Sequence, residues 1–327
     1  MASRLTPAAR FTPFVATLGR GPGRSRALTR DEAREAFGMV LRGEPDPHQV
    51  GAFLMLLRYR GEDADEVAGL VEAARDGIHL GADVELDWPS YGAGRSRGLP
   101  WFLLAALALA RAGIRVLMHG SNEFSSGIGV AEGLVALGLR PAASLADAER
   151  LLARDRFAYL PLENFSAPML RVLRLRDLFG LRSPVNTVAR LLDPGEAPAG
   201  VDGVFHPAYI ELHLGVAERL GRPRLLVLKG GGGEAERNPA KTIAAHLWDR
   251  EQGRAEYLLP TWCKADRGAA REDGPALLAA LWRKEATHPA ADAIVRATIA
   301  VALIALGRAR TPDEADGAAT AIWADAA

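Results

Sequence analysis

The sequence predicts an α/β protein with a small helical N-terminal domain and a larger domain built on a mostly parallel sheet. Helical periodicity with clear caps dominates residues 28–77, and beyond Trp88 short apolar strands alternate with helices. The length of 327 residues suits two domains. We expect a helical domain at residues 1–86, with a return segment at about 165–195, and an α/β domain at residues 87–327.

Three helices with capping signals account for the first segment. Thr29 begins the first helix in a capping box with Glu32. Asp46 begins the second, with Pro47 at the first helical position. A third helix with an acidic start runs to Gly77. The short turns between them indicate one compact helical unit.

Beyond Trp88 the pattern is typical of a parallel sheet with crossover helices. The predicted helices are residues 99–111, 130–137, 144–154 and 207–220, and the predicted strands are 115–118, 157–160, 201–205 and 225–228. Residues 166–192 are helical and rich in arginine, so we expect them to return to the helical unit.

Composition narrows the class of protein. Hydrophobic residues make up 49% and charged residues 24%, which excludes a disordered or fibrous chain. The longest apolar run, residues 99–110, is shorter than the ~20 residues that span a bilayer, and residues 11–18 do not form a signal peptide. The single cysteine, Cys263, excludes an internal disulfide. We expect a soluble cytoplasmic protein without membrane contact.

The formal net charge is zero, so bulk charge indicates no partner. Its distribution is uneven: residues 1–30 contain six arginines and no acid, whereas residues 62–87 contain nine acids and one arginine. Folding could therefore gather the basic segments on one face.

The first candidate binding loop is residues 91–98, directly before the helix at 99–111. Gly92 and Gly94 permit close backbone approach, Arg95 and Arg97 add positive charge, and a helix N-terminus favours an anion. A flexible connector is the alternative interpretation.

Two further loops follow predicted strands, where ligands of open α/β sheets bind. His119 and Ser121 lie in one, although a lone histidine there can equally be structural. Lys229 and four glycines begin the other, which is not a Walker A loop because residue 240 is not glycine. Histidine spacing and the absence of Gly-x-Ser-x-Gly predict no metal ligand and no catalytic triad. We assign no catalytic residue.

The three loops, in this order, resemble those of the anthranilate phosphoribosyltransferases, members of the nucleoside-phosphorylase-like glycosyltransferase group. The matching segments are residues 28–44, 49–62, 119–120, 125–126, 137–139, 180–186 and 227–230, and residues 297–323 resemble the closing helices of the family. The resemblance implies the two-domain fold, an active-site cleft between the domains and a two-fold homodimer through the first helices.

The chain departs from the family at the donor site. Gly-Ala-Gly-Arg-Ser at residues 92–96 replaces the Gly-Thr-Gly-Gly-Asp that holds the pyrophosphate of phosphoribosyl pyrophosphate (PRPP). The Asp-Glu pair that holds magnesium falls near Gly233 and Glu234, so one carboxylate of two remains. Arg176 matches the arginine that the family uses on the aromatic acid.

The replacing residues are basic, and the run at 229–239 resembles a diverged subgroup of the fold that binds nucleic acid. Cations without metal suit a polyanion. We therefore predict sequence-nonspecific binding of nucleic acid, single- or double-stranded, with no cofactor. The residues expected to bind nucleic acid or phosphate are Gly92, Gly94, Arg95, Arg97, His119, Ser121, Arg176, Lys229, Arg237 and Lys241, with Arg24 and Arg26 as a mobile extension.

Two other functions stay open. One is a phosphoribosyltransferase or glycosyltransferase with an altered substrate, which would use magnesium and PRPP. The other is a helical-domain interaction or scaffold protein. The arginines would be unavailable to any ligand if they paired with the acids of residues 62–87.

Overall fold

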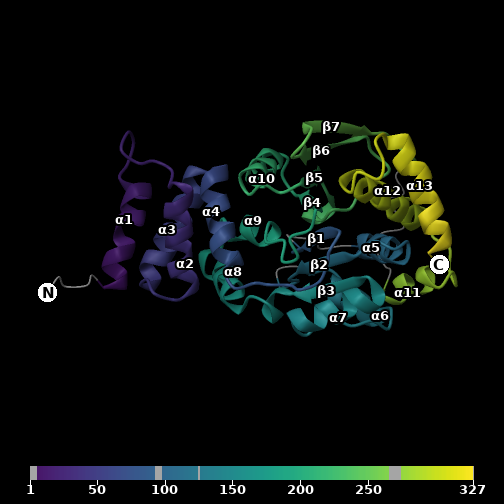
Figure 1. Ribbon diagram of the computed structural model, residues 1–327, viewed down its shortest axis with the longest axis horizontal. Helices are drawn as coiled ribbons and strands as arrows, with labels where there is room; N and C mark the ends of the chain where they lie inside the picture. Colours follow the sequence, from purple (N-terminus) through teal and green to yellow (C-terminus); the bar gives the residue numbers. More distant parts are fainter. Residues whose placement is uncertain (1–5, 93–97, 124–125, 265–273, 327) are drawn as a thin grey trace. The chain divides into compact units, whose positions relative to one another are not determined.

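The computed structural model describes residues 6–92, 98–123, 126–264 and 274–326. The chain divides into two compact units, one of Met1–Ile78 and Ser166–Leu192 and the other of His79–Phe165 and Asp193–Ala327. The first unit is helical, and the second is an α/β unit with a mostly parallel sheet (Figure 1). The predicted fold class is therefore confirmed.

The helical unit begins at the predicted caps. Thr29 and Asp46 each complete a capping box, and Asp63 forms a third. Arg75 donates hydrogen bonds to the carbonyls of Leu191 and Leu192, at 3.0 and 2.6 Å, which ties the return segment to the first helices. The described helices of this unit are α1 (Pro7–Gly19), α2 (Arg30–Leu41), α3 (Pro47–Arg60), α4 (Ala64–Arg75), α8 (Ala167–Phe179) and α9 (Val185–Arg190).

Helix α1 was not predicted, because Pro13 in its interior disfavours a helix. The Thr6 hydroxyl caps it by accepting from the N–H of Ala9 at 3.2 Å. Phe11 is fully buried, and its ring lies 5.3 Å from that of Phe53 on α3. Burial of this aromatic pair offsets the cost of the proline.

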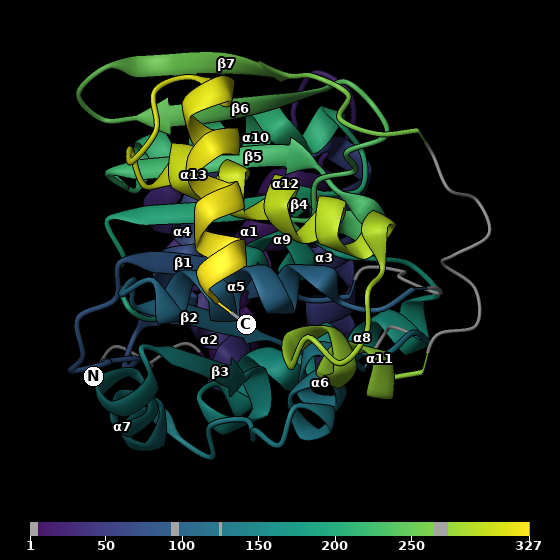
Figure 2. The ribbon, with the colours of Figure 1, turned by 90° about the vertical axis from the view of Figure 1, so that its right-hand side faces the viewer.

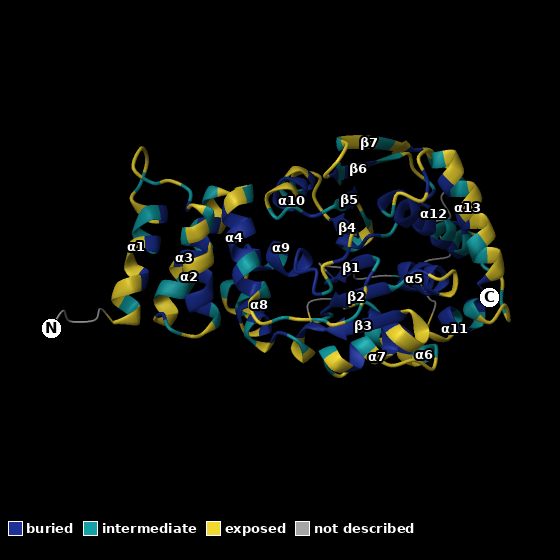
Figure 3. Ribbon diagram, viewed as in Figure 1, coloured by how far each residue is buried: buried dark blue, intermediate teal, exposed yellow. Residues whose placement is uncertain are grey.

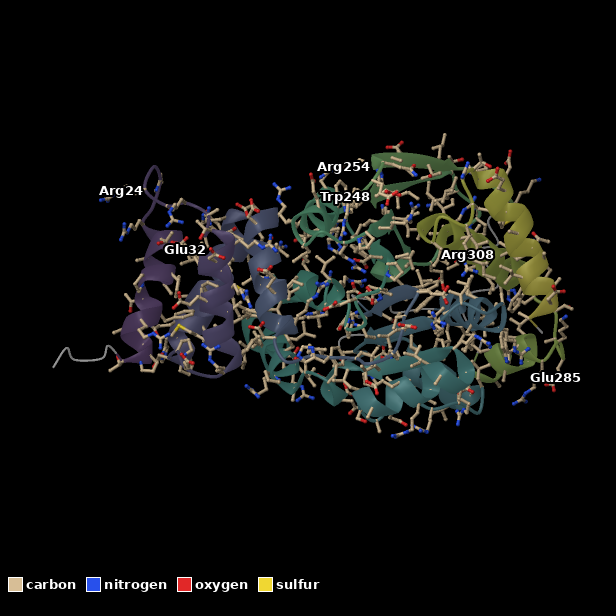
Figure 4. The ribbon with its side chains drawn as sticks, viewed as in Figure 1. Arg24, Glu32, Trp248, Arg254, Glu285 and Arg308 are labelled. Atoms are coloured by element: carbon tan, nitrogen blue, oxygen red, sulfur yellow. The ribbon has the colours of Figure 1, made fainter. Side chains whose placement is uncertain are left out.

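Arg26, in the loop before α2, is part of a helix cap. Its guanidinium donates to both carboxylate oxygens of Glu32, at 2.6 and 2.7 Å, and Glu32 also accepts from the N–H of Thr29. The hydrogen bonds from Arg26 lower the pKa of Glu32 to about 2. Arg26 is therefore ion-paired, whereas Arg24 is exposed in the same loop (Figure 4).

We expect the Glu32→Gln variant to lower the free energy of unfolding at pH 7 by about 1 kcal/mol, since it removes the solvent-screened ion pair with Arg26, while glutamine can still accept the Thr29 N–H in the capping box. A carboxyl whose pKa falls from 4.5 to about 2 on folding stabilises the protein above pH 4.5, and this contribution is lost as the pH falls toward 2. Urea titrations of both proteins at several pH values measure the difference. A difference that stays constant well below pH 4.5 would contradict the ion pair.

The α/β unit contains a seven-stranded sheet in the order β3-β2-β1-β4-β5-β6-β7 (Figure 2). Strands β1 to β5 pair in parallel, which confirms the mostly parallel sheet, although β1 was not among the predicted strands, and β6 and β7 add an antiparallel hairpin at one edge. This hairpin was missed because it is only partly buried and carries a weak apolar signal. The strands are β1 (Leu86–Ser90), β2 (Val116–Gly120), β3 (Phe157–Pro161), β4 (Ala199–Val204), β5 (Arg224–Lys229), β6 (Ile243–Asp249) and β7 (Gly253–Leu259).

Helices cover both faces of this sheet. Leu86 and Trp88 of β1 belong to the main core with α5 and α12, which are buried almost throughout (Figure 3). Helices α7 and α10 pack on the strands from the other face. The described helices of this unit are α5 (Trp101–Arg111), α6 (Val130–Ala136), α7 (Leu145–Asp155), η1 (Leu162–Asn164), α10 (Ala208–Arg219), η2 (Gly231–Gly233), α11 (Ala276–Trp282), α12 (Pro289–Ala305) and α13 (Pro312–Asp325).

None of the helices in the described ranges has both the length and the apolar character that a bilayer span requires.

Candidate functional site

The strand order places a candidate site at the carboxyl end of β1. From β1 the chain continues to β2 and β3 on one side, and then returns to β4 on the other. β1 pairs with β2 along its whole length but with β4 only at Leu86 and Asp87, so β1 and β4 part toward their carboxyl ends. Ligands of open α/β sheets bind at such a switch point.

Glu234, in the loop after β5, bridges this switch point. Its carboxylate accepts a hydrogen bond from the N–H of Gly92, after β1, at 2.6 Å. The loop must therefore pass close over β4: a Cβ on Gly203 would lie 2.1 Å from the Glu234 backbone, and one on Gly230 would lie 1.5 Å from the Glu234 carbonyl oxygen. Glycine at 203 and 230 is what lets Glu234 reach Gly92.

A second carboxylate of the same loop lies at the N-terminus of α5. The N–H of Phe102 donates to the Glu236 carboxylate at 3.0 Å. A helix N-terminus favours negative charge, and here the chain supplies that charge itself. The N-terminus of α5 was predicted to bind an anion from outside the chain, and in the structure it contacts the Glu236 carboxylate.

His119 lies within β2 and not in the loop after it, and it is fully buried. Its Nδ1 is 2.9 Å from the Tyr91 hydroxyl, and its Nε2 is 3.2 Å from a carboxylate oxygen of Asp87. Ser121, also buried, donates its N–H to the Ser90 carbonyl at 3.1 Å. Both predicted residues therefore hold the strand ends together.

Asp87 carries a charge in the middle of the sheet. Arg222 donates to it at 3.1 Å and also pairs with Asp193 at 3.2 Å. Burial alone would raise the pKa of Asp87, but His119 and Arg222 outweigh that effect and hold it below its usual range. Asp87 is thus kept as the charged partner of His119.

The predicted cations do not share one environment. Arg237 is fully buried, its guanidinium 3.2 Å from Asp316, 2.7 Å from the Pro260 carbonyl and 4.5 Å from the Trp262 ring. Burial lowers its pKa and raises that of Asp316. Arg237 is therefore a structural residue, which corrects its predicted place on a basic face.

The other predicted residues are more exposed or lie outside the described ranges. Lys229 and Lys241 are exposed on the α/β unit, and Arg176 is partly exposed on α8 of the helical unit. Gly94, Arg95 and Arg97 lie outside the described residues. The structure thus brings together Gly92, His119 and Ser121, at the ends of β1 and β2.

We expect the Arg237→Ala variant to lower the free energy of unfolding by about 3 kcal/mol, because it leaves Asp316 without its buried guanidinium partner. The Lys241→Ala variant is the matched control, an exposed cation of the same segment, and should change stability by less than about 0.5 kcal/mol. Urea denaturation measures both, and equal effects would contradict the structural role of Arg237.

Several residues of this site were not singled out from the sequence. Glu236, Arg222 and Asp193 are charged residues whose partners lie far away in the chain, so no local pattern indicates them. Asp87 had a detectable signal, since it interrupts an apolar segment directly before a glycine-containing loop.

Among the described residues no group of three or more His, Cys, Asp or Glu side chains could hold a metal ion by itself. At the switch point the chain provides the Glu234 carboxylate, which contacts Gly92 after β1.

Comparison with known proteins defines the family. The model of the glycosyl transferase family, helical bundle domain, matches residues 12–77, and that of the glycosyl transferase family, a/b domain, matches residues 102–324. The chain belongs to this glycosyl transferase family. Among its relatives, the anthranilate phosphoribosyltransferase of Beijerinckia indica is 32% identical over 225 residues, or 68% of this chain. The match spans 65% of the length of that enzyme.

Solved structures of the family share the whole fold. That of anthranilate phosphoribosyltransferase from Thermus thermophilus has a TM-score of 0.80 and 25% identity, and it covers 97% of this chain and 94% of its own. The Saccharomyces cerevisiae enzyme in complex with PRPP and Mg has a TM-score of 0.78 and 16% identity, with coverage of 97% and 94%. At that identity, the second likeness shows the fold alone.

The comparisons correct two predictions. Nucleic-acid binding as the function is wrong, because the relatives of this chain are phosphoribosyltransferases. The structure shows why the charge pattern misled: Arg237 is buried, and acids of residues 62–87 pair with other arginines, Glu72 with Arg30 and Asp76 with Arg34. The expectation of no cofactor is also wrong, because the curated relatives are anthranilate phosphoribosyltransferases, and a solved enzyme of that name with the same fold holds PRPP and Mg.

Proposed function

We propose that this protein is a phosphoribosyltransferase that uses PRPP as donor and an aromatic acid with an amino group as acceptor. The observation that carries the proposal is the convergence of the loops after β1 and β5 at the switch point, in a chain that matches anthranilate phosphoribosyltransferases. Backbone N–H groups in glycine-containing loops at the carboxyl ends of strands suit phosphate oxygens.

Glu234 fits a magnesium ion that is held mainly by its substrate. Mg²⁺ is usually bound through one or two carboxylates together with substrate phosphates. Glu234 is a buried carboxylate that accepts the Gly92 N–H, and a carboxylate can accept such a bond and ligate a cation at the same time. When bound, the ion would neutralise charge that develops on the leaving pyrophosphate. The chain itself contributes the position of Gly92, which Glu234 fixes.

Arg176 supports the choice of acceptor. It lies on α8 and matches the arginine that the resembling enzymes use on the aromatic acid. A guanidinium recognises a carboxylate through two parallel hydrogen bonds, which fits an aromatic acid better than an uncharged amine.

We also propose a two-fold homodimer formed by the helical unit. Tyr59, Leu178 and Leu181 of that unit are large apolar side chains that are 60–90% exposed, and burying them between two copies would stabilise a dimer. Sedimentation equilibrium should give twice the chain mass of 34.9 kDa, and the Tyr59→Ser, Leu178→Ser double variant should shift the protein toward monomer. A strict monomer for the unaltered protein would contradict the dimer.

The assay of the proposed function measures pyrophosphate release from PRPP and Mg²⁺ with anthranilate and its ring-substituted analogues as acceptors. The Glu234→Gln variant should lower kcat/KM about 100-fold, because it removes the carboxylate that would hold the magnesium ion, and with it the charge that neutralises the leaving pyrophosphate. Glu285→Gln is the matched control, an exposed glutamate after α11 (Figure 4), and should leave kcat/KM unchanged.

A thermal-shift titration complements this assay. PRPP with Mg²⁺ should raise the melting temperature, whereas Mg²⁺ alone should have little effect, because one carboxylate provides too few ligands. If PRPP with Mg²⁺ gives no shift and none of the acceptors releases pyrophosphate, the proposed function is wrong.

A further inference from the structure

The α/β unit contains two buried histidine–aspartate pairs, and one of them leads to the candidate site. His213 of α10 contacts Asp202 of β4 at 2.6 Å, with both side chains buried. His119 of β2 contacts Asp87 of β1 at 3.2 Å, and its other ring nitrogen contacts Tyr91, the residue before Gly92. Both pairs are buried, but His213 is hydrogen-bonded to its aspartate, whereas His119 lies in close contact with Asp87 and has its hydrogen-bond contact with Tyr91.

Among the described residues, two contacts anchor Tyr91 and Gly92 at the end of β1. The Tyr91 hydroxyl lies 2.9 Å from His119 Nδ1, and the ring planes meet edge to face with centroids 5.5 Å apart. The N–H of the next residue, Gly92, donates to Glu234. A side chain and a backbone group of adjacent residues are thus fixed to two different strands or loops of the sheet.

The His119 anchor is itself held by a chain of buried ion pairs. Asp87 accepts from Arg222 at 3.1 Å, and Arg222 pairs with Asp193 at 3.2 Å. Arg222 must cross β4 to reach Asp87 on β1, and it does so at Gly200, where a Cβ would lie 2.6 Å from its Nη2. Gly200 is the register partner of Asp87, so the glycine lies where the guanidinium passes.

We propose that His119 is a positioning residue: through Tyr91 it fixes the backbone at Tyr91 and Gly92, where β1 ends, and Asp87 and Arg222 fix His119. The effect of this positioning role on KM for PRPP rests on the proposed function, whereas its effect on hydrogen exchange of the Gly92 amide does not. Loss of the Tyr91 hydroxyl leaves the aromatic packing in place but releases one of the two anchors. The donor site then spends less time in its binding geometry, which raises KM for PRPP more than it lowers kcat.

The experiment compares amide hydrogen exchange of Gly92 in four full-length proteins. Exchange should be about tenfold faster in Tyr91→Phe than in the unaltered protein, because local opening becomes easier. Gly200→Ala, which displaces Arg222 without touching the loop, should act in the same direction. His213→Asn removes the matched pair beside Asp202 and should leave exchange at Gly92 unchanged.

Steady-state kinetics adds the second readout. Tyr91→Phe should raise KM for PRPP about fivefold and change kcat less than twofold, and His213→Asn should change neither. Unchanged Gly92 exchange in both Tyr91→Phe and Gly200→Ala overturns the positioning role, as does equal acceleration in His213→Asn. Faster exchange in a protein that never turns over PRPP supports the positioning role and contradicts the proposed function, so the two failures are distinguishable.

Discussion

A charged carboxylate in the middle of a sheet must be neutralised, and Asp87 imposes this requirement on the α/β unit. Its guanidinium partner, Arg222, comes from beyond α10 and reaches it across β4, which requires a glycine at position 200. The same carboxylate contacts His119 and so determines the environment of Tyr91. Buried ion pairs contribute little net stability compared with apolar packing, but removing one partner costs several kcal/mol. The pair therefore acts mainly on geometry, since few arrangements of these strands satisfy both charges.

Carboxylates also organise the loops at the carboxyl edge of the sheet. Glu234 and Glu236 lie two residues apart and bind backbone N–H groups of two different segments, Gly92 after β1 and Phe102 at the start of α5. Such N–H groups are the usual donors to phosphate oxygens. The chain thus fixes these two segments with carboxylates of its own, which accept from the kind of N–H group that a phosphate would otherwise use.

The parts that could be predicted from the sequence are those in which neighbouring residues determine the outcome. The caps at Thr29 and Asp46, the alternation of strands and helices and the glycine-containing loops all depend on local patterns. The function of each charge depends instead on distant partners. Arg237 is indistinguishable from an exposed cation until Asp316 and Trp262 are folded against it, and His119 was assigned to a loop because β2 is two residues longer than its apolar run. The distribution of charge along the sequence therefore predicted a basic binding face, whereas in the folded protein the contacts of Arg237 take it out of that face.

The division of the chain has a consequence for synthesis on the ribosome. The helical unit needs Ser166–Leu192, because Arg75 is bonded to the carbonyls of Leu191 and Leu192. The first three strands, β1 to β3, are translated before that segment emerges, and their neighbours β4 and β5 come after it. Arg75 therefore gains its partners Leu191 and Leu192 only after more than a hundred further residues have been made. During that time three of the seven strands are present, and the edge of β1 that later pairs with β4 is exposed. Exposed strand edges of this kind are where chains associate wrongly, so the nascent chain is most vulnerable between the completion of β3 and the arrival of β4.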